Sequence, residues 1–126
     1  MSDEITLTIP REREFLSVAH LVLGGVGVRL NLTFDILEDL QLALDAILER
    51  DREPGDITIA LRVGMNTIEA AVGPLRDGVQ SELARESGEE VGLRRILDTL
   101  VDSVEVESRG GACWVKLRKT VEDGQA

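Results

Sequence analysis

Aromatic residues are almost absent from this sequence. One Trp, two Phe and no Tyr make up 2% of the 126 residues, whereas 43% of the residues are hydrophobic. The core of the protein must therefore be packed with aliphatic side chains. Binding of single-stranded nucleic acid by base stacking is disfavoured, because that mode needs several exposed aromatic rings.

Positive charge is also scarce. The chain has 24 acidic residues against 14 basic ones, which gives a formal net charge of −10. No run of Lys or Arg provides a basic patch, so phosphate backbones and anionic membrane surfaces would be repelled. We therefore expect neither nucleic acid nor a membrane as a direct partner.

Cysteine and histidine occur once each, as Cys113 and His20. No intrachain disulfide can form, and a zinc site of Cys and His ligands cannot be assembled from one of each. Cys113 alternates with Trp114 in an apolar segment, so we expect Cys113 to pack in the core. For His20, which falls within a helical pattern, we expect a surface or partly buried structural role.

Long hydrophobic runs are missing as well. The longest, around "LVLGGVGV", is too short to span a membrane and is interrupted by glycine. The N-terminal segment "MSDEITLTIPRERE" is acidic and strand-like, unlike the basic and apolar regions of a signal peptide. The sequence therefore predicts a cytoplasmic protein without a bound metal.

The first half of the chain predicts one strand and two helices. Alternating apolar residues indicate a strand over 5–10, and helical spacing of apolar residues follows over 12–30. Three glycines at positions 24, 25 and 27 either fray this first helix or allow another backbone to approach closely. Thr33 is a suitable N-cap for a second helix that reaches about Arg50.

The second half predicts two hairpins separated by helices. Alternation over 56–63 and 66–72 indicates the first hairpin, and 103–120 the second, which turns on Gly110-Gly111. A short helix over 79–86 and a longer one over 91–102 lie between them. This order predicts a single α+β domain over 1–126, with frayed ends at 1–3 and 121–126. Its architecture is a two-layer sandwich: a mixed, mostly antiparallel five-stranded sheet with about three helices on one face.

Three ordered segments resemble the anti-sigma-factor serine kinases of bacterial partner-switching systems, which are small members of the GHKL (histidine-kinase-like) ATPase family. The segments are "LTFDILEDLQLAL", "ITIALRV" with "NTIEAAV", and "EEVGLRRILDTLVDSVEVES" with "GGACWVKLRK". They are similar to the start of the family's N-box helix, the hairpin before its adenine loop, and its glycine-led helix with the final hairpin. The resemblance covers nearly the whole chain and implies the histidine-kinase-like ATPase fold.

The resemblance fails first at the N-box helix. The family has a glutamate that acts as a base and, four residues later, an asparagine that binds Mg²⁺. Those positions fall on Ala46, which has no proton acceptor, and Arg50, whose positive charge would repel the metal. A register shifted by one places Asp45 and Glu49 there instead, and this alternative stays open.

The adenine loop and the second glycine motif also depart from the family pattern. Pro74 stands where the family's aspartate recognises adenine, and of that motif only Gly78 is retained. Asp77 is either a displaced adenine ligand or a turn residue beside glycine. Gly92 and Leu93 match the second nucleotide motif, although neighbouring glutamates would repel a triphosphate.

Because these nucleotide-binding residues are missing, the sequence predicts a non-catalytic, anti-sigma-factor-like regulator that binds other proteins and needs no cofactor. The resemblance implies a sigma factor or a STAS-type anti-anti-sigma protein as its partner. Two alternatives remain: an ATP-dependent serine kinase with a remodelled Mg²⁺–ATP site that uses Asp45, Glu49 and Asp77, and a dimerising structural module.

The second hairpin carries a candidate interface. If Cys113 faces the helices, Trp114, Lys116 and Arg118 lie on the uncovered face of the sheet. We expect Trp114 to have Thr6, Thr8 and Arg62 as neighbours there. A tryptophan beside arginines is a typical anchor of a protein interface, and this face or the sheet edge is also a candidate surface for a homodimer.

Overall fold

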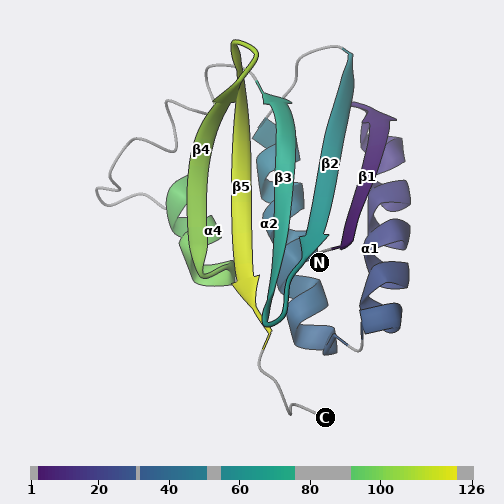
Figure 1. Cartoon of the computed structure of the whole chain (residues 1–126). Helices are drawn as coiled ribbons and strands as arrows, with labels where there is room; N and C mark the ends of the chain where they lie inside the picture. Colours follow the sequence, from purple (N-terminus) through teal and green to yellow (C-terminus); the bar gives the residue numbers. More distant parts are fainter. Residues whose placement is uncertain (1–2, 31, 51–54, 76–91, 122–126) are drawn as a thin grey trace.

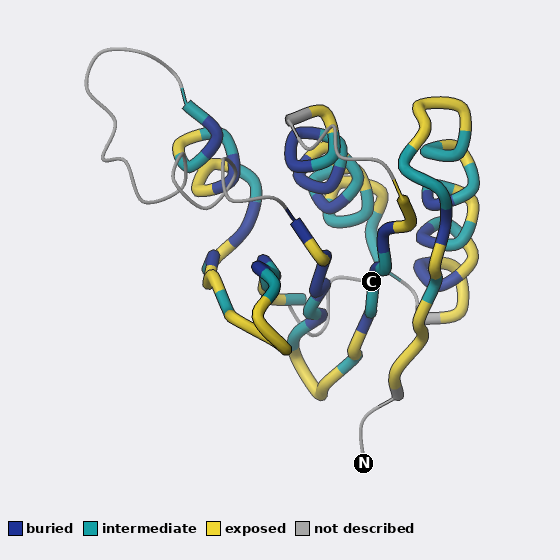
Figure 2. The backbone as a smooth tube through the Cα atoms, turned by 90° about the horizontal axis from the view of Figure 1, so that it is seen from above, coloured by how far each residue is buried: buried dark blue, intermediate teal, exposed yellow. Residues whose placement is uncertain are grey.

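The computed structural model describes residues 3–30, 32–50, 55–75 and 92–121. Its elements are β1 (Asp3–Pro10), η1 (Arg13–Phe15), α1 (Leu16–Leu30), α2 (Phe34–Arg50), β2 (Asp56–Val63), β3 (Thr67–Leu75), α4 (Leu93–Leu100), β4 (Ser103–Arg109) and β5 (Ala112–Thr120). Figure 1 shows one sheet with α1, α2 and α4 behind it, and the view from above in Figure 2 separates the two layers. The predicted two-layer α+β sandwich is confirmed.

The sheet has the strand order β1-β2-β3-β5-β4 (Figure 1). All four pairings are antiparallel, so no parallel pair occurs among the described strands, and the expected mixed character of the sheet is wrong. Both hairpins form as predicted. Gly110 and Gly111 have φ angles of 58° and 83°, the left-handed region that a two-residue hairpin turn requires.

One face of the sheet supplies the floor of the core. The pleat points alternate residues of each strand toward the helices, and most of these residues are aliphatic. The fully or nearly fully buried ones from the three central strands are Ile57, Ile59, Leu61, Ile68, Ala70, Val72, Leu75, Cys113, Val115 and Leu117. The predicted core position of Cys113 is confirmed.

The helices close this core from one side. Thr33 is the N-cap of α2, because its Oγ1 accepts a hydrogen bond from the amide of Ile36 at 3.2 Å. The first helix runs without interruption through its three glycines. Only Gly27 is closely packed, since an added Cβ would lie 3.2 Å from Leu37 of α2, whereas Gly24 and Gly25 have open space.

Some predictions fall on residues that the structure does not describe. The short helix over 79–86 lies there, as do Asp77, Gly78 and most of both termini. Of the residues expected to fray, Asp3 begins β1, and Val121 donates its amide to the Asn66 carbonyl at 2.7 Å. Within the described ranges, no helix is long and apolar enough to cross a membrane.

Candidate functional site

The last two turns of α2 hold the candidate base position. Ala46 is 8% exposed and belongs to the central hydrophobic cluster, beside the fully buried Ile47. Its methyl group fills apolar space and can neither accept a proton nor orient water. Arg50, at the candidate metal position, is the last residue of the helix.

The alternative base, Asp45, is already hydrogen-bonded. Its Oδ1 lies 2.8 Å from Nε2 of His20 on α1, in a partly buried position between the two helices. This contact gives His20 the structural role that the sequence predicted, because it joins α1 to α2. Asp45 therefore points toward α1, on a different side of α2 from Ala46.

Pro74 lies near the end of β3 and follows a cis peptide bond after Gly73. Its carbonyl oxygen accepts a hydrogen bond from the guanidinium of Arg11, which ties the end of β1 to the end of β3. The side chain of Pro74 is exposed and carries no group that could recognise an adenine amino group.

Gly92 and Leu93 begin α4. Gly92 is its N-cap, with an extended backbone, and its carbonyl accepts the amide of Ile96 at 3.1 Å. Leu93 is fully buried and shares one hydrophobic cluster with Ala46, Leu75 and Cys113. Of the predicted nucleotide positions, Ala46 and Leu93 are thus parts of the apolar core, whereas Pro74 is exposed.

Metal ligation finds no support in the described ranges. No group of three or more His, Cys, Asp or Glu side chains there is arranged to hold a metal ion. Glu49, the alternative metal ligand, lies at the exposed edge of a cavity near the start of α1.

On the uncovered face of the sheet, Trp114 packs flat over the backbone of β3 and under an arginine. A Cβ added to Gly73 would lie 2.4 Å from the indole ring, so only glycine allows this close approach. The guanidinium carbon of Arg109 lies 4.7 Å from the ring centroid, within the range of a cation–π interaction.

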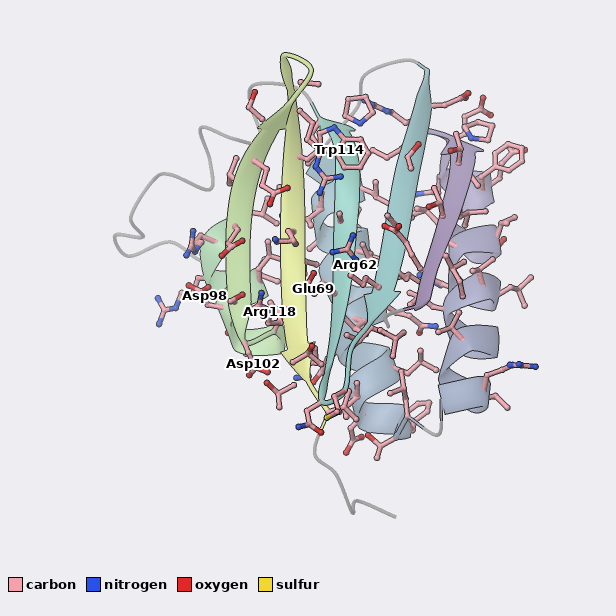
Figure 3. All side chains as sticks on the ribbon, in the orientation of Figure 1. Arg62, Glu69, Asp98, Asp102, Trp114 and Arg118 are labelled. Carbon is pink, nitrogen blue, oxygen red and sulfur yellow. The ribbon has the colours of Figure 1, made fainter. Side chains whose placement is uncertain are left out.

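Other charged side chains on this face form ion pairs across neighbouring strands (Figure 3). Arg118 lies 2.9 Å from Glu69 on β3. Lys116 lies 3.4 Å from Glu105 and 3.2 Å from Glu107 on β4. On the same face, near the β1 edge of the sheet, Arg62 lies 3.8 Å from Glu4. We call these pairs, together with the Arg109–Glu107 pair, the charge ladder.

The ion pairs of the charge ladder shift the pKa values of two of its side chains, Glu107 and Lys116. Hydrogen bonds from Arg109 and then Lys116 hold the pKa of the Glu107 carboxyl below its usual value of 4.5. Hydrogen bonds to Glu107 and Glu105 raise the pKa of the Lys116 ammonium above its usual value of 10.5. Both shifts favour the charged forms, which is the expected effect of opposite charges at close range.

The expected neighbours of Trp114 are wrong. Thr6 and Thr8 lie on β1, which two strands separate from β5, and Thr8 instead shares a 2.9 Å hydrogen bond with Thr58. Figure 3 places Arg62 well below Trp114 on the same face. The prediction failed because sequence alternation assigns a residue to a face but does not give the order of strands.

The true partner of Trp114, Arg109, was missed. A sequence signal was present, because a two-residue turn at Gly110-Gly111 sets Glu107 opposite Trp114. Arg109 then follows on the same face of the neighbouring strand, within reach of a diagonal contact.

Comparisons with known proteins agree with the motifs of the sequence. No protein-family model matches the chain. The serine-protein kinase RsbW of Listeria monocytogenes serovar 1/2a is 28% identical over 129 residues, covering 84% of this chain and 80% of the relative. The proteins of the same name from Bacillus velezensis and Bacillus subtilis are each 26% identical, and cover 86% and 87% of this chain and 81% of their own length. The chain is therefore a distant relative of the RsbW serine-protein kinases, the kind of protein that its motifs predicted.

Proposed function

We propose that this protein is a non-catalytic regulator of the anti-sigma-factor type, which acts by protein–protein binding in bacterial partner-switching signalling. In this proposal the usual Mg²⁺–ATP site has been lost, and no nucleotide is bound. The similarity to RsbW proteins over 84% of the chain supports the regulatory role.

The main support for the proposed loss of catalysis is the environment of Ala46. A general base must reach the proton that it abstracts, and this position offers a buried methyl group within an aliphatic cluster. The nearest carboxylate along the helix, that of Asp45, is directed to His20. Neither residue supplies a base at the family's position.

We further propose that partners bind to the uncovered sheet face, through Trp114, Arg62, Lys116 and Arg118. By resemblance the partners are a sigma factor and a STAS-type antagonist, which compete for overlapping surfaces. The net charge of −10 favours a basic partner and would accelerate its association at low ionic strength.

Thermal unfolding with and without millimolar Mg²⁺–ATP tests the loss of the nucleotide site. A ligand at one hundred times its dissociation constant stabilises a protein by about 2.7 kcal/mol, which would raise the Tm of a domain of this size by several degrees. We expect no shift with ATP or ADP. A reproducible increase in Tm would overturn the non-catalytic assignment.

Binding is tested separately with purified sigma factor and STAS protein from the same organism, by calorimetry. Trp114→Ala should weaken the complex at least about tenfold, as is typical for a buried aromatic anchor. Leu21→Ala, on the exposed side of α1, is the control and should leave the affinity unchanged. Equal effects of the two variants would remove Trp114 from the interface.

The names of the relatives favour one alternative, an active serine kinase with a remodelled site. It would use Asp45 as base, with Glu49 and Asp77 as ligands of Mg²⁺ and adenine. Transfer of radiolabelled phosphate from ATP to the STAS protein, abolished by Asp45→Asn, would establish this alternative. The third candidate, a dimerising module without other partners, predicts a stable dimer in sedimentation experiments and no binding to either protein.

A further inference from the structure

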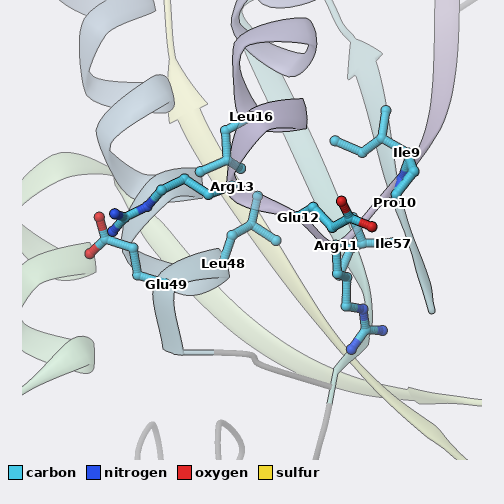
Figure 4. Close-up of a pocket in the computed structure, with 9 residues that line it drawn as sticks. All are labelled: Ile9, Pro10, Arg11, Glu12, Arg13, Leu16, Leu48, Glu49 and Ile57. Carbon is cyan, nitrogen blue, oxygen red and sulfur yellow. The ribbon is translucent and has the colours of Figure 1, made fainter. Parts of the chain in front are cut away.

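A cavity of about 420 Å³ lies where β1 ends, α1 begins and α2 ends (Figure 4). Its volume falls in the range of small-molecule sites. Ile9 and Ile57 from the sheet, which are almost fully buried, form its floor together with Leu16 and Leu48. The cavity thus offers apolar surface from both layers of the fold.

This cavity is distinct from the position of the nucleotide site. Leu48 lies two residues after Ala46, which places it about 200° around the helix axis. Leu48 and Glu49 share the side of α2 on which Asp45 contacts α1. Ala46, at the family's base position, lies on another side of the helix, whereas Glu49 of the shifted register lies at the rim of this cavity.

The rim of the cavity is charged. Glu12, Arg13 and Glu49 line it, and Figure 4 shows Arg13 and Glu49 pointing toward one another. Arg11 also contributes to the wall, but its guanidinium is directed away from the centre and donates to the Pro74 carbonyl. Opposite the Arg13–Glu49 side, Glu12 adds a carboxylate, and among the described lining residues neither arginine is directed toward it.

We propose that this cavity is a binding site for a small amphipathic amine, a molecule with an apolar body of roughly ten heavy atoms and one ammonium group. The body would lie on the four aliphatic side chains. The ammonium would lie beside the carboxylate of Glu12, since the carboxylate of Glu49 already faces Arg13. The net charge of −10 adds attraction for a cation. This inference does not depend on the proposed function.

Three probes of nearly equal size separate charge from shape: 2-phenylethylamine, 2-phenylethanol and 3-phenylpropionate. Titrations of the isotope-labelled protein are followed by the methyl NMR signals of isoleucine and leucine. We expect saturable shifts at Ile9, Leu16, Leu48 and Ile57 with the amine, and affinity about fivefold weaker for the carboxylate, as one partly exposed charge contact allows. Equal affinity for amine and carboxylate would overturn the proposal, and so would shifts spread over unrelated methyl groups.

Two matched pairs of variants locate the site. Glu12→Gln should reduce the preference for amine over alcohol about threefold, whereas Glu14→Gln, an exposed neighbour outside the cavity, should not change it. Leu16→Trp fills the cavity and should abolish binding of the amine and the alcohol. Leu21→Trp on the exposed side of the same helix should preserve both, and loss of binding in this control would contradict the assigned site.

Discussion

The two faces of the sheet are built on the same strands but are held together by different interactions. Along β5, Cys113, Val115 and Leu117 point to the helices and are buried, while Trp114, Lys116 and Arg118 point away from them. The covered face contributes aliphatic area that is removed from water. The uncovered face contributes ion pairs and one aromatic contact, all of them partly exposed.

Because of this difference, the covered face contributes most of the stability, and the uncovered face is the one available for recognition of a partner. Burial of a large aliphatic side chain contributes about 1.5–3 kcal/mol, whereas an exposed ion pair contributes about 0–1 kcal/mol. The charge ladder has four carboxylates, Glu4, Glu69, Glu105 and Glu107, and four cations, Arg62, Arg109, Lys116 and Arg118. Its net charge is zero in a chain of −10, so the excess negative charge belongs to residues outside the charge ladder.

The largest effect is expected on the covered face. Leu117→Ala removes a fully buried side chain from the centre of the core, and should lower the free energy of unfolding by about 2–5 kcal/mol. Urea denaturation measures this loss. Arg118→Ala, one residue further and on the opposite face, should cost less than about 1 kcal/mol. Similar losses for the two variants would contradict the contrast between the faces.

The next effect concerns the one closely packed contact on the uncovered face. In Gly73→Ala the new methyl group would overlap the Trp114 ring, and we expect a loss of about 1–3 kcal/mol. Gly25→Ala is the control: an added Cβ meets nothing within 4 Å in α1. That variant should stabilise the protein by up to about 1 kcal/mol. Thermal unfolding of both variants measures whether the two changes in stability have opposite signs.

A smaller effect depends on pH. Because the pKa of Glu107 is lowered in the folded protein, its contribution is present above pH 4.5 and is lost as the pH falls through the folded pKa. Lys116 behaves oppositely: its raised pKa makes its contribution disappear as the pH rises beyond 10.5. Glu107→Gln should flatten the loss of stability below pH 4.5, and an unchanged acid profile would exclude Glu107 as a contributor.

The smallest effect is the coupling within a single ion pair. A double-mutant cycle on Glu69 and Arg118, which lie 2.9 Å apart, should give about 0.5 kcal/mol at low salt. At 1 M salt the coupling should fall toward zero because exposed charges are screened. Coupling that resists salt would show that this pair is more shielded from water than its exposure indicates.

The architecture was predictable because local patterns determine it. Thr33 as an N-cap, the alternation of β5 and the Gly110-Gly111 turn each act over a few residues, and all three predictions are confirmed. The strand order needs long-range information. Without that information, the neighbours expected for Trp114 were wrong. The antiparallel pairing of β1 with β2, which makes the whole sheet antiparallel, was not predicted either.

For the candidate site, the sequence predicted which residues occupy the family's positions but not their surroundings. Ala46 could be recognised as unable to act as a base, whereas its burial among aliphatic side chains and the Asp45–His20 contact required coordinates. The cavity beside α1 left no sequence signal, because its walls come from two regions that are distant along the chain, 9–16 and 48–57. A motif describes residues close in sequence, and a cavity depends on how remote segments pack.

The place of β1 in the sheet has a consequence for how the chain folds. β2–β3 and β4–β5 are hairpins that form from near neighbours, but β1 pairs with β2 only after both α1 and α2 have been traversed. Closing a loop of that length costs conformational entropy before any contact is gained, which slows the step. We therefore expect β1 to dock late in refolding, and its amides to exchange with solvent before those of β3 and β5 in the native state.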